Sequence, residues 1–444
     1  MRIDRLHIEN FKKFASQDFD FHPHFTLLVG ENGSGKTSVL DALAVALGIW
    51  HKAAPSSNGW RNILKEEVRF DPVDAGDRIL WKLVLPAKIT AKGVIGRSEG
   101  LSWTRMIRQG GMRTTNAEAH DAEAAIIELV KGAEAQRELL PVLAYYGAGR
   151  AWKSTNKRPT GPTNIGKPQQ FDAYRHCLDT RIRDYELNDW FLFETAAANG
   201  HSEGRPGFRA AKQAVLACIP EADGLRYDSD LKEIVLSING NQQPFYNLSA
   251  GQRMMLAMAA DIAIKAVTLN SYLLGPGQPG ADDPMQILER SPGVVLIDEL
   301  DVHLHPIWQR RVATDLKRIF RSIQFICTSH SPQVIGEVSR DEVRLLTSKG
   351  VKRPSVALGA DSNWILDHVM EGSTSETPSA RLLQNKAEDA LAEGDLPSAH
   401  ERLLQLRRLL DGDTGELVRL ESSLHSLEAL AEESAKRNTP SEND

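Results

Sequence analysis

This chain of 444 residues has few cysteines, no long apolar run and no excess of positive charge. The three cysteines, Cys177, Cys218 and Cys327, lie far apart and form no C-x-x-C pair, which argues against a disulfide framework and a zinc site. No apolar stretch approaches the roughly 18 residues needed to cross a bilayer, and the first residues do not resemble a signal sequence. We therefore expect a cytoplasmic protein without a membrane partner.

The overall charge limits the ways in which this chain could meet nucleic acid. A formal net charge of −6 gives no global attraction, so any such contact needs a local basic patch. The best candidate is the segment 147–171, which has five basic residues and no acidic one. Its glycines and prolines favour a solvated loop, and nucleic-acid contact stays an alternative. The remaining composition, 41% hydrophobic and 25% charged, is typical of a globular protein with two to three domains.

One glycine-rich stretch carries a complete phosphate-loop motif, G-x-x-x-x-G-K-[ST]. An apolar run at 25–29 predicts the strand that enters it, and the run 38–47 predicts the helix that leaves it. Backbone amides left uncovered by glycine, the positive end of the helix and the Lys36 ammonium would all face a triphosphate. Thr37 can place its hydroxyl on Mg²⁺. The predicted nucleotide-binding residues are Gly30, Glu31, Asn32, Gly33, Ser34, Gly35, Lys36, Thr37 and Ser38.

A second motif, Leu-Ser-Ala-Gly-Gln, occupies residues 248–252 just before a strongly apolar stretch. It resembles the ABC signature L-S-G-G-Q with alanine in the third position. Ser249 is expected to cap the following helix, and free amides of Ser249, Ala250 and Gly251 would present positive charge to a phosphate. Gln252 completes this candidate set. A serine before a helix is common, but its place downstream of a phosphate loop makes the motif informative.

Two buried-strand patterns end in polar residues that suit catalysis. The apolar run 293–297 leads into Asp298 and Glu299, and open α/β sheets place ligands at such strand ends. Asp298 suits the Mg²⁺ shell, whereas Glu299 can orient and partly deprotonate the attacking water. The strand pattern at 323–328 leads to His330, at the place where ABC-type ATPases keep the switch histidine that senses the γ-phosphate.

The stretches between these motifs predict strands first and helices later. Residues 1–29 alternate as two short strands with a turn at 16–18, and 60–145 are typical of an antiparallel β lobe followed by a helix and a buried strand. Helical spacing returns at 174–219. The segment 275–292, rich in proline and glycine, is expected to be an exposed insertion.

The C-terminal region shows amphipathic helical patterns at 379–432, joined at 394–397, with another turn at 411–415. They resemble a single TPR-like hairpin, whose apolar stripe must meet the rest of the chain, another subunit or a partner. We assign it to assembly or effector docking. The predicted domains are an N-terminal lobe at 1–170, a helical subdomain at 171–246, a lobe with signature and switch histidine at 247–350, a C-terminal helical region at 351–432 and a disordered tail at 433–444.

Phosphate loop, signature, Asp-Glu strand and histidine follow one another in the order of the ABC-type ATPase superfamily, and the chain is identified as a member. This resemblance implies an α/β ABC-type ATPase head with a β lobe, a mostly parallel sheet around the phosphate loop and a helical subdomain, with the helical hairpin added. It also implies ATP and Mg²⁺ as cofactors. Residues 8–14 resemble the opening of RecF, SMC and OLD proteins, which implies that Lys12 and Lys13 lie beside the adenine. Asp301 is expected among the nucleotide-contacting residues.

Three further runs, 297–309, 324–333 and 359–366, resemble the ATPase subunit of Septu-type antiphage systems, which also occur beside retrons. That family works with an HNH nuclease, so the resemblance implies a nucleotide-gated regulatory subunit with a nuclease partner. One phosphate loop and one signature per chain imply a head-to-tail homodimer, with a higher oligomer left open. For the Q-loop glutamine of the superfamily, Gln109 and Gln136 are candidates without supporting context.

Two functions therefore compete. The first is a nucleotide-gated regulator of a separate nuclease, and the second is a RecF- or SMC-like DNA-binding ATPase in repair or recombination. A self-contained OLD-like nuclease is rejected, because its TOPRIM domain needs a D-x-D pair on a strand, whereas Asp411 and Asp413 lie in a turn between predicted helices. A neighbouring HNH gene would favour the first function.

Overall fold

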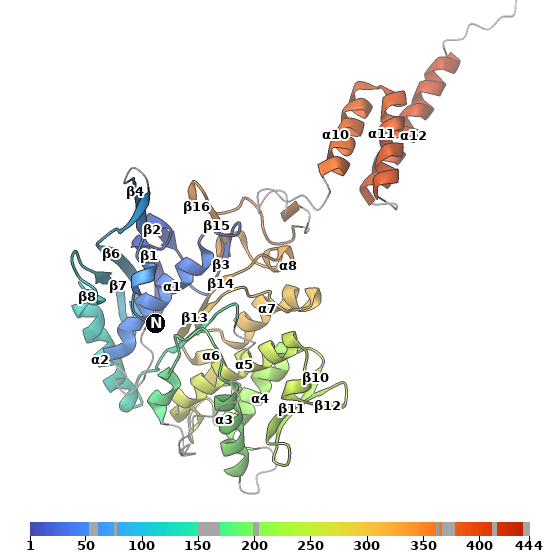
Figure 1. Cartoon of the computed structure of the whole chain (residues 1–444). Helices are drawn as coiled ribbons and strands as arrows, with labels where there is room; N and C mark the ends of the chain where they lie inside the picture. The colour runs from blue at the N-terminus through green and yellow to red at the C-terminus, as the bar shows by residue number, and fades with distance from the viewer. Residues whose placement is uncertain are drawn as a thin grey trace, which may run out of the picture. The chain divides into compact units, whose positions relative to one another are not determined.

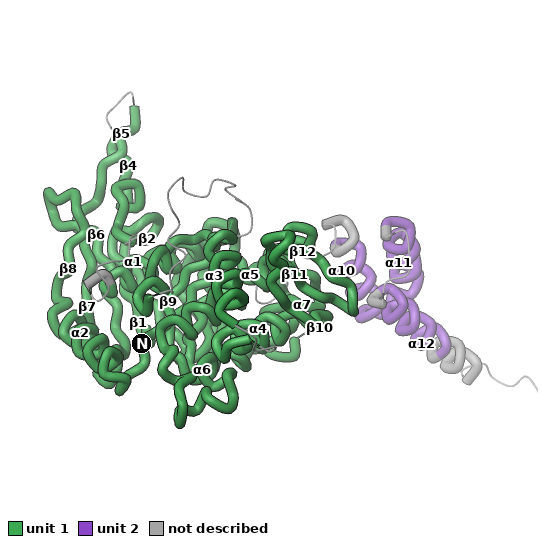
Figure 2. The backbone as a smooth tube through the Cα atoms, turned by 90° about the horizontal axis from the view of Figure 1, so that it is seen from below, with its two compact units in different colours: residues 1–365 green, residues 366–444 purple. Residues whose placement is uncertain are grey.

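The computed structural model describes residues 1–52, 61–74, 78–149, 169–198, 204–360, 362, 364–365, 378–410 and 415–437. The chain divides into two compact units, Met1–Ile365 and Leu366–Asp444 (Figure 2). The first unit contains all of the predicted nucleotide-binding motifs. Across the described ranges, the helices lack the combination of length and apolarity that a membrane span requires.

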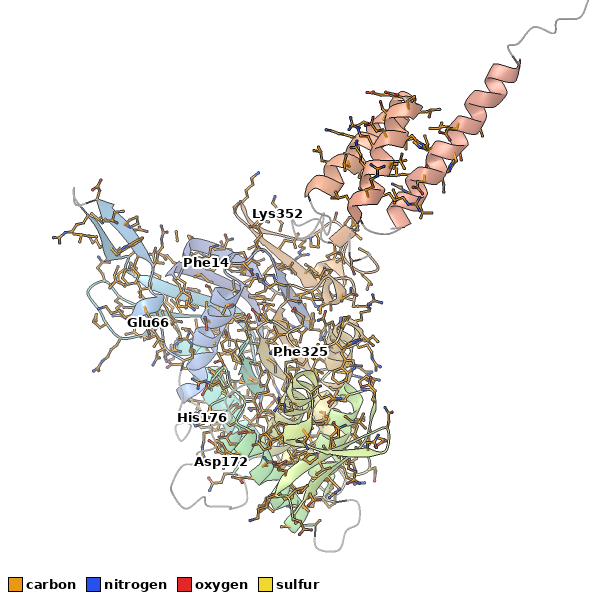
Figure 3. All side chains as sticks on the ribbon, turned by 45° about the vertical axis from the view of Figure 1, so that its right-hand side comes forward. Phe14, Glu66, Asp172, His176, Phe325 and Lys352 are labelled. Atoms are coloured by element: carbon orange, nitrogen blue, oxygen red, sulfur yellow. The ribbon has the colours of Figure 1, made fainter. Side chains whose placement is uncertain are left out.

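A six-stranded sheet forms the centre of the first unit (Figure 1). Its order is β16-β15-β3-β14-β13-β9, and only the edge strand β16 is antiparallel to its neighbour. Every residue of β3, β9, β13 and β14 is buried, as is typical of parallel strands covered on both faces, and Phe325 of β14 is labelled within this sheet (Figure 3). The predicted strands at 25–29, 293–297 and 323–328 are confirmed. The six strands are β3 (Phe25–Val29), β9 (Val142–Tyr146), β13 (Gly293–Ile297), β14 (Ile323–Thr328), β15 (Val343–Thr347) and β16 (Gly350–Lys352).

The predicted β lobe is an antiparallel sheet of order β2-β1-β6-β7-β8, with a separate β4-β5 hairpin. The predicted turn at 16–18 is wrong, because these residues lie within β2 and pair with β1. The chain turns at Lys12, which has a φ of 48°. Since β2 is an edge strand, its exposed polar side chains do not mark a turn. The strands are β1 (Arg2–Phe11), β2 (Phe14–Asp20), β4 (Phe70–Asp74), β5 (Ile79–Leu83), β6 (Ala87–Ile95), β7 (Ser98–Ile107) and β8 (Thr115–Ala117).

A buried glutamine joins the two large sheets. Gln324 on β14 donates from Nε2 to the carbonyl oxygens of Ile3 and His22, over 2.8 and 3.1 Å. Its Oε1 accepts from the Ile3 amide over 2.8 Å. Three hydrogen bonds thus satisfy the buried side-chain amide and hold β1 against β14.

The helix that follows the phosphate loop, α1 (Lys36–Leu47), is anchored at its C-terminal end by a buried arginine. Arg105 on β7 donates to the Val45 carbonyl over 2.7 Å and to two oxygens of the segment 61–62. Burial lowers the pKa of Arg105 to about 10, so it stays charged at neutral pH, where the negative helix end favours it. A Cβ on Gly48 would collide with this guanidinium, so only glycine fits there.

The region 171–246, predicted as a helical subdomain, also contains the antiparallel sheet β10-β11-β12. Asn239 and Gly240, with φ of 50° and 78°, form the turn between β11 and β12, a tight hairpin of the type that Asn-Gly favours. The segment 275–292, predicted as an exposed insertion, contains the short helix α6. Ile287 and Leu288 of this helix are fully buried, so the prediction is wrong for this part of the segment. The remaining elements are α2 (His120–Glu134), α3 (Asp184–Ala196), α4 (Pro206–Cys218), β10 (Ala222–Asp228), β11 (Glu233–Ile238), β12 (Asn241–Pro244), α5 (Ala250–Leu269), α6 (Met285–Arg290), α7 (Pro306–Ile319) and α8 (Pro332–Ile335).

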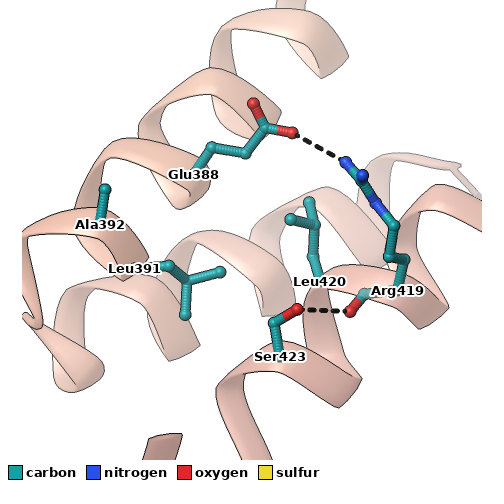
Figure 4. A pocket seen from close by; sticks show the side chains of 6 residues that line it. All are labelled: Glu388, Leu391, Ala392, Arg419, Leu420 and Ser423. Carbon is teal, nitrogen blue, oxygen red and sulfur yellow. Dashed lines mark hydrogen bonds and ion pairs between the residues drawn. The ribbon is translucent and has the colours of Figure 1, made fainter.

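The described part of the second unit contains three helices, α10 (Pro378–Glu393), α11 (Leu396–Leu410) and α12 (Gly415–Arg437). The predicted hairpin is therefore extended by a third helix, and α12 continues into the stretch predicted as a disordered tail, of which 438–444 lie outside the described residues. The three helices share a core of Ala387, Ala390, Ala399, Leu403, Leu406, Leu417, Leu420 and Leu424. A groove between α10 and α12, about 310 Å³ in volume, is bridged by the ion pair of Glu388 and Arg419 over 3.5 Å (Figure 4).

Candidate functional site

The phosphate loop leaves β3 and enters α1 with its tip, residues 31–33, open to solvent. Gly33 and Gly35 have left-handed φ values of 77° and 105°. A Cβ on Gly35 would lie 2.6 Å from the ring of Phe14, and one on Gly30 would lie 2.5 Å from a carbonyl oxygen of β15. The neighbouring residues therefore leave no room for a side chain at Gly30 or Gly35. Since glycine has no side chain, the amides of the loop stay uncovered, which suits a phosphate cradle.

Lys36 is only 7% exposed and is held by the loop that precedes it. Its Nζ donates to the carbonyl oxygens of Gly30 and Glu31, over 2.7 and 2.9 Å. Burial lowers the pKa of Lys36, while the carboxylates of Asp298 and Glu299 act against this shift. The ammonium therefore lies inside the loop, close to the acidic end of β13.

A hydroxyl and a carboxylate that suit a magnesium ion lie together at the end of β13. Thr37 Oγ1 donates to Asp298 over 3.0 Å, and Thr328 Oγ1 donates to the other carboxylate oxygen over 2.7 Å. Asp298 is 5% exposed and shares this oxygen-rich site with the start of α1. Oxygen ligands of this kind fit Mg²⁺, so Thr37 and Asp298 could hold the ion beside a bound phosphate.

Glu299, two residues beyond the end of β13, has an unusual backbone conformation. Its φ of 50° lies in the left-handed region, where residues other than glycine are uncommon. Its amide donates to Thr328 Oγ1 over 2.7 Å, so one hydroxyl contacts both acidic residues at the end of β13. Such strain at a strand end is often found at functional sites.

Asp301 holds the loop that carries His330. Its Oδ1 accepts from Ser329 Oγ over 2.6 Å and from the His330 amide over 3.3 Å. Burial and, to a smaller extent, the Lys36 charge lower the pKa of His330, so the imidazole is neutral at neutral pH. Asp301 thus connects the ends of two neighbouring parallel strands.

The signature residues stand at the start of α5. Ser249 Oγ accepts from the Gln252 amide over 3.3 Å, and Gln252 Oε1 accepts from the Ser249 amide over 3.0 Å. The predicted cap is confirmed as a capping box, but the predicted free amide of Ser249 is wrong, because Gln252 occupies it. A Cβ on Gly251 would lie 2.5 Å from the His303 carbonyl oxygen. The start of α5 therefore packs against the loop after Glu299 in the same chain.

The two lysines of the β1–β2 turn have different surroundings. Lys13 Nζ donates to the Gly33 carbonyl over 2.6 Å, so it lies against the phosphate loop. Lys12 forms ion pairs with Asp41 of α1 and, over 3.5 Å, with Glu67. The structure thus brings Lys13 to the predicted site and places Lys12 in an ion-pair cluster beside α1.

Sequence reasoning missed this cluster, which also contains Arg61 and the Tyr145 hydroxyl on β9. The phenol donates to Asp41 over 3.3 Å. A usable signal was present, because Asp41 is the single charged residue in the apolar run 38–47 and a buried charge needs partners.

The Q-loop glutamine and two of the sequence segments singled out above remain without an assigned place in the site. β9 lies beside β13, and its Tyr146 carbonyl accepts from the Asp298 amide over 2.7 Å, yet no glutamine follows this strand end directly. Gln109 follows β7 and Gln136 follows α2. Most of the basic segment 147–171 lies outside the described residues, as do Asp361 and other positions of the run 359–366.

Known proteins resemble this chain along most of its length. The family model "RecF/RecN/SMC N terminal domain" matches residues 2–352. "Retron Ec83 probable ATPase" of Escherichia coli is 24% identical, covering 84% of this chain and 76% of the relative. "Septu protein PtuA" of Bacillus thuringiensis is 23% identical, covering 77% and 74%. The SMC head domain from Thermotoga maritima is 13% identical, with a TM-score of 0.42, covering 80% of this chain and all of that one.

These similarities confirm the predicted relationship to RecF- and SMC-like ATPases and to those of retron and Septu systems. The family model covers the described strands of the central sheet together with the phosphate loop, the signature and the Asp-Glu strand. The chain therefore belongs to the RecF/RecN/SMC N terminal domain family and has the α/β fold of an ABC-type ATPase head.

Proposed function

We propose that this chain binds and hydrolyses ATP as the regulatory subunit of an antiphage defence complex and that it controls a partner HNH nuclease. The hydrolytic part rests chiefly on the contact of Thr37 with Asp298 beside the buried Lys36. The defence part is supported by the names of the retron and Septu relatives. Control of a nuclease is inferred from the resemblance of the sequence to the ATPase subunit of Septu-type systems.

Each residue of the site has a stated task in this proposal. Loop amides and Lys36 bind the β- and γ-phosphates, and Thr37 and Asp298 would hold Mg²⁺, which neutralises charge on the transferred phosphoryl group. Glu299 orients the attacking water and accepts its proton. The neutral His330 would hydrogen-bond the γ-phosphate, and Asp301 keeps its loop in position.

We further propose that ATP closes a head-to-tail dimer, in which Ser249 of one copy completes the site on the phosphate loop of the other. Lys36→Ala and Ser249→Arg variants would each be inactive alone. Mixed in equal amounts, they should recover about a quarter of native ATP hydrolysis, because half of the dimers are mixed and each has one intact site of two. Phosphate release measured against mixing ratio tests this.

Mixing two differently tagged Lys36→Ala preparations is the control and should recover nothing. Absence of recovery in the mixed sample, although tag pull-down shows that mixed dimers form, would exclude a shared site. Full activity of the native protein at dilutions where it is a monomer would exclude it as well.

The second unit is proposed to dock the partner or a further subunit. It has its own helical core, and Leu382, Leu404, Leu409 and Val418 are 43–55% exposed on it. A chain that ends at residue 372 should bind ATP normally but lose higher assembly or nuclease association. Light scattering and co-purification with the nuclease measure these properties.

A double variant, Leu404→Glu with Leu409→Glu, should have the same effect without removing any helix, whereas Ser422→Glu on the exposed side of α12 should not. Unchanged assembly and nuclease binding in the double variant would refute the docking role. If truncation prevented the first unit from folding, the alternative of packing against the ATPase body would be favoured.

A further inference from the structure

One glutamine contacts both loops that follow the central strands of the site. The first loop, 301–304, comes after the Asp-Glu pair of β13, and the second, 329–331, comes after β14 and contains His330. Gln309 lies in the first half of α7, between these loops. Neither the phosphate loop nor the signature contains it, and it has no task in the hydrolysis proposed above.

The hydrogen bonds of the Gln309 side chain fix its orientation. Its Nε2 donates to the Leu304 carbonyl over 2.9 Å and to the Asp301 carbonyl over 3.3 Å. Its Oε1 accepts from Ser331 Oγ over 2.6 Å. Because carbonyl oxygens can only accept hydrogen bonds, a flipped side-chain amide would place Oε1 against the two carbonyl oxygens, which is unfavourable. Gln309 therefore uses both of its polar ends, one on each loop.

The opposite side of the first loop is held as well. The Asp301 carboxylate accepts from Ser329 Oγ and from the His330 amide. Ser329 Oγ in turn accepts from the Ser331 amide over 2.9 Å. Two bridges, through the Asp301 carboxylate and through Gln309, thus join the two loops. Interactions inside such a network strengthen one another.

We propose that Gln309 is a positioning residue that makes the loop 301–304 and the switch loop 329–331 move as one unit. This inference rests on the proposed hydrolysis of ATP. The first loop also carries the His303 carbonyl, which packs against Gly251. Any displacement of the signature start is therefore passed through Leu304 and Gln309 to Ser331 and His330.

The coupling predicts a specific kinetic defect. Gln309→Met keeps the length of the side chain but removes its three hydrogen bonds. Hydrolysis should slow by about 10- to 100-fold, since an error of roughly 1 Å in the placement of a catalytic group can have that effect. ATP affinity should stay within about twofold of native, because the affinity depends mainly on the phosphate loop and Lys36. Gln309→Glu should be slower still, because its carboxylate would face two carbonyl oxygens.

The test compares Gln309→Met and Gln309→Glu with Arg311→Met, an exposed position on the same helix. Single-turnover hydrolysis, equilibrium binding of ATP and thermal unfolding are measured for each variant. A fall in hydrolysis with unchanged affinity and melting temperature supports positioning. Native hydrolysis in both Gln309 variants, or a loss of hydrolysis matched by an equal loss of affinity or stability, would overturn it.

Hydrogen exchange separates this inference from the proposed function. In the native protein, the amides of 301–304 and 329–331 should open with one common rate and respond together to added ATP. In Gln309→Met, the two segments should exchange at different rates. Equal exchange in both proteins would contradict the coupling, even if hydrolysis falls. If the native protein fails to hydrolyse ATP, the proposed function fails, and the exchange rates still decide whether the loops are coupled.

Discussion

Replacing Glu299 by glutamine should leave ATP bound and slow its hydrolysis by about 10²- to 10⁴-fold, the usual contribution of a general base. Glutamine keeps the size of the side chain and removes its negative charge and its basicity. The contacts assigned to nucleotide and metal binding, those of Lys36 and of Thr37 with Asp298, do not involve the Glu299 carboxylate. The amide hydrogen bond to Thr328 belongs to the backbone and survives the substitution.

The Glu299→Gln protein is best followed by phosphate release in a single turnover and by retention of labelled ATP after rapid gel filtration. Glu337→Gln, at an exposed position after α8, makes the same chemical change away from the site and should behave as the native protein. Hydrolysis by Glu299→Gln at the native rate would show that another group activates the water.

Replacing Lys36 by alanine should weaken ATP binding on the order of 10²-fold or more. The ammonium is nearly buried and lies where the loop carbonyls of Gly30 and Glu31 converge. With ATP bound, the ammonium would form charge-assisted hydrogen bonds to the phosphates, which contribute about 1.5–3 kcal/mol each, and alanine loses them without any replacement. It also leaves the carboxylates of Asp298 and Glu299 without a neighbouring cation that would favour a phosphate.

Equilibrium binding of a fluorescent ATP analogue to Lys36→Ala, with and without Mg²⁺, gives this affinity directly. Lys92→Ala removes an exposed lysine from β6 and is the matched control. Both variants should unfold cooperatively in the absence of nucleotide, which shows that a lost affinity is not a lost fold. An affinity close to native in Lys36→Ala would mean that the loop amides alone hold the phosphates and that Lys36 has another role.

The parts of the fold that could be predicted are those specified by local sequence. The strand at 25–29, the phosphate loop and the strand before Asp298 combine continuous apolar runs with fixed motif spacing, and each needs no knowledge of its neighbours. The cap at Ser249 was equally local. By contrast, the turn at Lys12 depends on which strand lies at the edge of the sheet, which the alternation of residues does not reveal.

Other features of the site follow from contacts between distant segments and have no local pattern. The Asp301 carboxylate accepts hydrogen bonds from Ser329 and His330, which follow another strand, and its expected contact with the nucleotide stays a prediction. Lys12 forms ion pairs with Asp41 and Glu67, and its expected place beside the adenine stays a prediction. Side-chain amides such as Gln309 bond with backbone carbonyls, and the sequence carries no signal for such carbonyls.

The strand order has a consequence for synthesis on the ribosome. β3 emerges early, but its two partners, β14 and β15, follow nearly 300 residues later. At roughly 5–20 residues per second, translation needs about 15–60 s to supply them. During that time the apolar β3 lacks both of its strand partners, whereas α1 can already pack against β1, β6 and β7. A polypeptide released before β14 is made lacks the strand that joins β3 to β13 and therefore cannot bring Asp298 beside Thr37, although its phosphate-loop motif is already present.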